Sequence, residues 1–124
     1  MRPVSNQIPA VFIHVRDLKK SVKWYSEIFG LHVDLDTVVS PVHNVPMKGG
    51  TGLTLDDHTF DDQFTHQPSP NPIANFLAAD IDEAYEFLQQ KNVKIVREIE
   101  RIGKKFAWFN FSDPDGNVLM VCTC

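Results

Sequence analysis

The chain has 124 residues, with 43% hydrophobic and 23% charged side chains, which suits one globular domain but not two of ordinary size. Its net charge of −4 at pH 7 argues against a nucleic-acid or anionic-membrane partner, because both need clustered lysine and arginine. No apolar run approaches the roughly 18 residues of a membrane span, and no signal-type apolar segment stands in the first nine residues, so we expect a cytoplasmic protein.

The first half of the chain predicts one helix among four strands. Residues 8–15 are rich in β-branched and aromatic side chains, which is typical of a strand. Asp17 is expected to cap a helix that Gly30 ends, since apolar residues fall on one helical face at Leu18, Val22, Tyr25 and Phe29. Further strands are predicted at residues 31–39, about 42–47 and 51–55.

The second half predicts the same order of elements. A strand at residues 73–79 precedes a helix at 81–90, which Asp80 caps with Glu83 at the spacing of a capping box. Asn92 is expected to take the left-handed conformation after this helix. Three strands follow, at residues 93–99, 105–112 and 117–123.

These elements form an internal repeat with a shift of 63 residues, which places Asp17 on Asp80 and Tyr25 on Leu88. Between the copies lies a segment rich in Asp and Pro with few apolar residues. We therefore divide a single domain, residues 1–124, into a first module at about 8–56, a linker at about 57–72 and a second module at about 73–123. The predicted fold class is α+β, with two βαβββ modules.

The sequence Asp113-Pro114-Asp115-Gly116-Asn117 predicts a tight turn between two apolar strands. Together with the paired modules and the segment from Val15 to Tyr25, this turn resembles the vicinal oxygen chelate superfamily. That superfamily contains glyoxalase I, extradiol dioxygenases, fosfomycin-resistance enzymes and bleomycin-resistance proteins. The resemblance covers roughly residues 8–122, and it implies mixed sheets curled into a half-barrel around a pocket that a homodimer often completes.

The resemblance also implies positions for a metal, and these positions carry no suitable ligand. The family's ligands stand seven residues before each helix cap and four after the hairpin glycine, which gives Ala10, Ile73 and Met120. The remaining ligand comes from the strand at residues 51–55, which has no His, Asp or Glu. We therefore expect no metal and no cofactor. A two-residue shift of the alignment would bring His14 or Asp56 to a ligand position.

Strand alternation predicts which side chains line the pocket. Phe109 and Phe111 join this lining if the closing turn is four residues long. The predicted ligand-binding residues are Phe12, His14, Thr54, Asn75, Leu77, Phe109, Phe111 and Met120. Such a lining suits an aromatic or hydrophobic small molecule, whereas the alternative is that these side chains fill the space as core. His14 has the further alternative of a strand-end histidine satisfied by solvent or backbone, and His58 is expected in the linker without a ligand role.

Three functions remain open from the sequence. The first is metal-independent binding of a small hydrophobic or aromatic molecule by a homodimer, in sequestration or resistance, as in bleomycin-resistance proteins. The second is a glyoxalase-type lyase or a dioxygenase with a displaced metal site. The third is a scaffold with a filled core. No spacing supports a catalytic triad or a phosphate loop, so catalytic residues stay unassigned, as does the pairing of modules within one chain or across a dimer.

The two cysteines, Cys122 and Cys124, lie near the end of the predicted last strand. In an extended strand their Cα atoms would be roughly 6.5 to 7 Å apart, at the edge of disulfide reach. We therefore expect two reduced, partly buried thiols, with a reactive role as the less favoured alternative.

Overall fold

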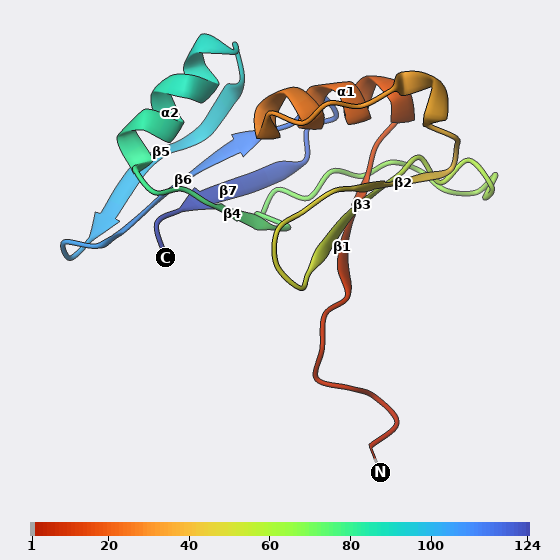
Figure 1. Cartoon of the computed structure of the whole chain (residues 1–124), viewed down its shortest axis with the longest axis horizontal. Coiled ribbons are helices and arrows are strands. Elements are labelled where there is room, and N and C mark those ends of the chain that lie inside the picture. Colours follow the sequence, from red (N-terminus) through yellow and green to blue (C-terminus); the bar gives the residue numbers. More distant parts are fainter. Residues whose placement is uncertain (1) are drawn as a thin grey trace. The chain divides into compact units, whose positions relative to one another are not determined.

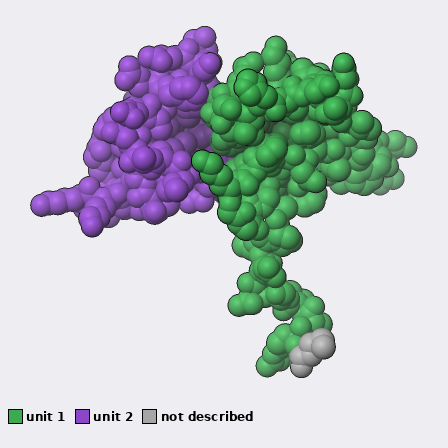
Figure 2. Space-filling view, viewed as in Figure 1, with its two compact units in different colours: residues 1–65 green, residues 66–124 purple. Residues whose placement is uncertain are grey.

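The computed structural model describes residues 2–124 and divides the chain into two units, residues 1–65 and 66–124 (Figures 1 and 2). Each unit contains one α-helix and one mixed sheet. The predicted α+β class is therefore confirmed. None of the described helices is long and apolar enough to cross a lipid bilayer.

The first unit places helix α1 (Leu18–Phe29) over a three-stranded sheet (Figure 1). Its strands are β1 (Ala10–His14), β2 (Val42–Val45) and β3 (Gly52–Asp56), in the order β1-β3-β2 with β1 parallel to β3. The predicted helix ends are confirmed. Asp17 accepts a hydrogen bond from the amide of Lys20, and Gly30 has the left-handed φ of 69°.

The strand predicted at residues 31–39 is wrong. This segment instead contains η1, a short 3₁₀ helix at Leu35–Thr37. The Asp34 carboxylate accepts a hydrogen bond from the amide of Asp36, and the Thr37 hydroxyl donates to the Asp34 carbonyl. These local bonds occupy groups that a strand would pair with a neighbour, so the first module has three strands rather than four.

The second unit places helix α2 (Ile81–Gln90) on a four-stranded sheet. The strand order is β4-β7-β6-β5, with β4 parallel to β7 and the other pairs antiparallel. Asp80 caps α2 by accepting from the amide of Glu83, and Asn92 has a φ of 59°, both as predicted. The strands are β4 (Asn75–Leu77), β5 (Lys94–Ile102), β6 (Phe106–Ser112) and β7 (Val118–Cys122).

The turn between β6 and β7 has five residues, 113–117, because Ser112 pairs with Val118. The Asp113 carboxylate holds it together: one oxygen accepts from the amides of Asp115 and Asn117 at 2.9 Å, and the other accepts from the Asn117 side chain at 2.8 Å. Gly116 takes a φ of 84°, which favours glycine. An odd number of turn residues reverses the faces expected from a four-residue turn.

The cores of the two units lie on the helix-covered faces of their sheets. In the first unit these side chains include Ile13, Leu53 and Leu55, packed with Val22 and Tyr25 of α1 at nearly zero exposure. In the second unit they are Phe109, Phe111, Leu119 and Val121 on the sheet, with Ile81 and Leu88 from α2. The opposite, helix-free faces are therefore where a binding site can form.

The prediction of two reduced thiols is wrong, because Cys122 and Cys124 form a disulfide. Strand β7 ends at Cys122, and the Cα atoms of the two cysteines are 5.5 Å apart, closer than the distance expected for an extended strand. That separation lies within the ordinary range for a disulfide. The amide of the Asn75 side chain lies 3.4 Å from the sulfur of Cys122.

Candidate functional site

The helix-free face of the first unit is built from β1 and β3. In their parallel register Phe12 lies beside Thr54 and His14 lies beside Asp56, so these four side chains share one face. Phe12 is 56% exposed there although it is large and apolar. The Thr54 hydroxyl donates to the Asn44 side-chain oxygen at 2.8 Å. The structure thus brings together the three residues predicted for this unit, whereas their ligand-binding role stays a prediction.

The helix-free face of the second unit is built from β4, β7 and β6. Met120 pairs with Asn75 on one side and with Asn110 on the other, and Leu77 pairs with Cys122. Leu77 is 80% exposed. Asn110 is buried, and its side-chain oxygen has no hydrogen-bond partner among residues 2–124. Asn75, Leu77 and Met120 therefore share a face as predicted, and Asn110 adds an unpaired acceptor that sequence reasoning missed.

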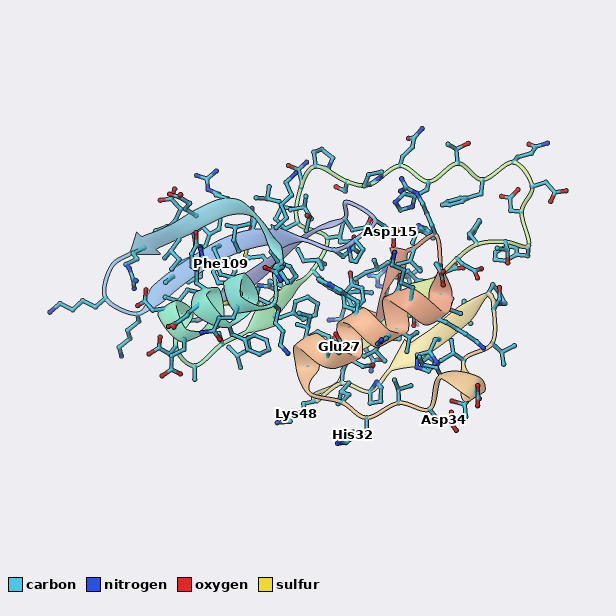
Figure 3. The ribbon with its side chains drawn as sticks, turned by 90° about the horizontal axis from the view of Figure 1, so that it is seen from above. Glu27, His32, Asp34, Lys48, Phe109 and Asp115 are labelled. Carbon is cyan, nitrogen blue, oxygen red and sulfur yellow. A yellow bond between two sulfur atoms is a disulfide. The ribbon has the colours of Figure 1, made fainter. Side chains whose placement is uncertain are left out.

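Phe109 and Phe111 do not join this face, so their predicted place in the pocket lining is wrong. They pair with Val121 and Leu119 in the register that the five-residue turn sets, and this points them toward α2. Figure 3 labels Phe109 beside that helix, and its ring meets the ring of Tyr85 edge-on at 5.1 Å between centroids. Both phenylalanines are fully buried, as core side chains.

A second group of polar side chains gathers at the end of β3. His58 turns back toward the strand, so that its Nδ1 lies 3.3 Å from one carboxylate oxygen of Asp56. The Nε2 of His14 lies 3.8 Å from the same oxygen. The composition of residues 57–72 predicted a linker with no ligand role for His58, so this group was not predicted. The available signal was an aspartate two residues before a histidine at a strand end, a spacing at which the carboxylate bonds the backbone amide of the histidine.

The internal repeat identifies the counterpart of Met120 in the first unit. Phe12 and Asn75 are 63 residues apart, and they pair with Thr54 and Met120 respectively. Thr54 therefore stands where the family's remaining metal ligand is expected. Together with Ala10, Ile73 and Met120, it offers one neutral hydroxyl and one thioether, which does not fit a hard divalent ion.

A separate groove of about 500 Å³ lies in the second unit, between the start of α2 and the loop that joins β5 to β6. Its walls include Asp80, Arg101, Lys104, Lys105 and Cys124. Leu77 is the only predicted site residue that lines it. The groove carries charged side chains on its walls, and among the predicted site residues it shares only Leu77 with the face that carries Met120.

The chain resembles solved structures of one fold group. A glyoxalase/bleomycin resistance protein/dioxygenase superfamily member from Sphaerobacter thermophilus is 21% identical, with a TM-score of 0.72 over 95% of this chain and 97% of that one. A glyoxalase/dioxygenase from Nostoc punctiforme is 18% identical, with a TM-score of 0.66 over 94% and 90%. A lactoylglutathione lyase from Agrobacterium tumefaciens is also 18% identical, with a TM-score of 0.67 over 98% and 95%. At such identities these likenesses establish the fold alone.

Sequence comparison establishes the family. No curated protein matches the chain. The family model described as Glyoxalase/Bleomycin resistance protein/Dioxygenase superfamily matches residues 7–121, which is nearly the whole chain. The chain therefore belongs to the glyoxalase/bleomycin resistance protein/dioxygenase superfamily.

Proposed function

We propose that this protein binds a small molecule with an aromatic or apolar body, and that it does so without a metal at the positions the superfamily uses. The binding surface is the helix-free face of each sheet. Phe12, Leu77 and Met120 provide the apolar contacts there, and Thr54 and Asn75 provide the polar ones. The role that follows is sequestration or resistance, as in the bleomycin-resistance proteins of the superfamily.

One observation carries this proposal: the helix-free faces expose large apolar side chains beside polar groups. Phe12 is 56% exposed and Leu77 is 80% exposed, although both stand on sheet faces rather than in loops. Exposed apolar side chains that stand beside polar groups on a sheet face support an interaction site there. The absence of suitable ligand atoms at Ala10, Ile73, Thr54 and Met120 favours binding over metal-assisted catalysis at that place.

The test is a thermal-shift and titration screen of aromatic compounds against protein treated with a chelator. A compound that binds the native state raises the melting temperature. The Phe12→Ala and Leu77→Ala variants are expected to weaken binding about tenfold or more, which corresponds to about 1.4 kcal/mol. Val39→Ala and Phe87→Ala are the matched controls, because both residues are exposed and apolar, and Val39 lies in the loop after η1 whereas Phe87 lies on helix α2, outside the proposed surface.

We propose in addition that the protein acts as a homodimer, because superfamily members often complete their pockets across a dimer. Sedimentation equilibrium measures this directly. A dimer that binds one compound per pocket supports the proposal. A monomer that binds the same compound with the same dependence on Phe12 and Leu77 rejects the dimer and keeps the binding function.

A second function is favoured by the histidines at the end of β3. A lyase or oxygenase that uses a displaced metal would need ligands near the same face, and His14, Asp56 and His58 lie there. Solved structures similar to this chain include a lactoylglutathione lyase and a glyoxalase/dioxygenase. Activity of the metal-loaded protein on glutathione hemithioacetals or catechols would establish this alternative, and inactivity on both would reject it.

A further inference from the structure

Three side chains of the first unit converge at the end of the β1–β3 strand pair. His14 is the last residue of β1, Asp56 is the last residue of β3, and the two are register partners. His58 follows two residues later with a φ of 55°, a left-handed conformation that non-glycine residues rarely adopt. This backbone conformation brings its ring back to the carboxylate of Asp56.

The distances between the three side chains lie close to the ligand spacing of a small cation. One oxygen of Asp56 lies 3.3 Å from Nδ1 of His58 and 3.8 Å from Nε2 of His14. One ligand atom from each residue lies within 4.8 Å of the others. Ligand atoms about 2.0 Å from a tetrahedral ion lie roughly 3.3 Å apart. Asp56 and His58 already have this spacing, and His14 would move closer to both to complete the geometry.

The carboxylate between the histidines is buried and already oriented. The Asp56 side chain is 7% exposed, and its other oxygen accepts a hydrogen bond of 2.7 Å from the backbone amide of His58. A buried carboxylate needs a compensating charge or strong donors. The 3.8 Å separation from His14 is too long for a hydrogen bond, whereas a cation between the two atoms would contact both.

The surroundings of His58 also resemble those of metal ligands. Its second ring nitrogen, Nε2, lies 3.6 Å from a carboxylate oxygen of Asp61, and ligating histidines usually present their other nitrogen to a carboxylate or carbonyl. The ring of Phe64 packs against both histidines, at 4.9 Å from His14 and 4.3 Å from His58 between centroids. On the open side, the His14 side chain is 40% exposed, which leaves room for water or another ligand.

We propose that His14, Asp56 and His58 bind a divalent transition-metal ion of the zinc class. Two imidazoles and one carboxylate are the ligand set of such ions, whereas Mg²⁺ and Ca²⁺ prefer oxygen alone. This site differs from the superfamily positions at Ala10, Ile73, Thr54 and Met120. It goes beyond the proposed binding function and departs from the expectation of no cofactor. The ion adds a charged point beside Phe12, on the same face of the sheet.

The test is zinc binding by untagged, chelator-treated protein under non-reducing conditions, which keep Cys122 and Cys124 in their disulfide. We expect one zinc ion per chain by metal analysis after dialysis. Calorimetric titration should give an affinity that falls about tenfold or more in His14→Gln, His58→Gln and Asp56→Asn. Cobalt(II) should replace zinc and give visible absorption without the strong sulfur charge-transfer band that thiolate ligands produce.

The matched control is His32→Gln, because His32 is an exposed histidine of the same unit on the loop after α1 (Figure 3). This variant should keep the wild-type affinity. His14→Gln guards against misfolding of the Asp56 variant, because His14 is the most exposed of the three residues. No retained zinc in folded wild-type protein, or equal affinity in all variants, would overturn the proposal. Because the probe is zinc alone, a failure to bind zinc does not affect the proposed binding of aromatic compounds. A failure to bind aromatic compounds likewise does not affect the proposed zinc site.

Discussion

Each unit lays its first strand parallel to its last strand and covers one face of the sheet with a single helix. In the first unit β1 lies beside β3, and in the second β4 lies beside β7. Both helices begin at an aspartate whose carboxylate accepts from the amide three residues later, Asp17 and Asp80. The repeat thus preserves the groups that determine backbone conformation.

The two units differ at the end of the parallel strand pair. His14 beside Asp56 in the first unit becomes Leu77 beside Cys122 in the second. The first unit therefore brings possible metal-ligand atoms together at this place. In the second unit Leu77 is exposed there, and Cys122 forms a disulfide with Cys124. The comparison indicates that helix caps and the helix-covered face maintain the fold, and that the helix-free face is available for divergent function.

The largest expected effect tests the division between the two faces. Phe109→Ala should lower the free energy of unfolding by about 3–5 kcal/mol, because it removes a fully buried ring that packs against Tyr85. Phe12→Ala should change it by less than about 0.5 kcal/mol, since Phe12 lies exposed on the helix-free face. Urea unfolding followed by circular dichroism measures both. Equal losses of unfolding free energy in the two variants would contradict the conclusion that the core lies on the helix-covered face.

The next effect concerns the loops that differ between the units. Asp113→Ala should cost about 2–3 kcal/mol, because the buried Asp113 carboxylate satisfies two backbone amides and the Asn117 side chain. Asp34→Ala in the first unit should cost about 0.5–1 kcal/mol, since its carboxylate is exposed and accepts one amide bond. The same unfolding experiment compares them. A larger loss for Asp34 would show that η1 contributes more to stability than the turn at residues 113–117 does.

Local signals explain what could be predicted from the sequence. The bounds of α2 were correct because the cap at Asp80 and the apolar face both act within a few residues. The resemblance and the repeat gave the α+β class for the same reason, since they rest on caps, periodicity and turn residues. The strand expected at residues 31–39 failed because the side chain of Asp34 bonds the local backbone and competes with strand pairing.

The placement of side chains in the site depends on turn length and local backbone conformation, which the periodicity of the sequence does not predict. Strand alternation placed Phe12, His14 and Thr54 on one face correctly. It placed Phe109 and Phe111 wrongly because a turn of five residues rather than four reverses the face, and the turn length depends on how Asp113 bonds the backbone. The position of His58 beside Asp56 was not predicted, because its left-handed φ lies in a segment whose composition predicts only a linker.

A smaller effect tests whether the repeat is equivalent in energy as well as in geometry. Asp17→Ala and Asp80→Ala should each cost about 1 kcal/mol, because each removes one acceptor for an amide of the first helical turn. Asp17→Asn and Asp80→Asn are the matched controls and should recover most of the loss, since asparagine also caps helices. The melting temperatures of the four variants measure this. Different losses for Asp17→Ala and Asp80→Ala would show that the two caps contribute unequally to stability, although their geometry is the same.

The smallest expected effect lies at the ion pair of the second unit. Arg101 and Asp82 approach to 2.6 Å, but both side chains are more than half exposed, so solvent screens their attraction. Arg101→Ala should therefore lower the free energy of unfolding by no more than about 0.5 kcal/mol, and the difference should shrink at high salt. Arg97→Ala is the reference, because Arg97 also pairs with Glu100 and packs over the ring of Trp108 at 4.9 Å. Arg101→Ala could instead lower the free energy of unfolding more than Arg97→Ala does, by an amount that salt leaves unchanged. That result would mean that the contacts of Arg101 in the wall of the groove stabilise the second unit.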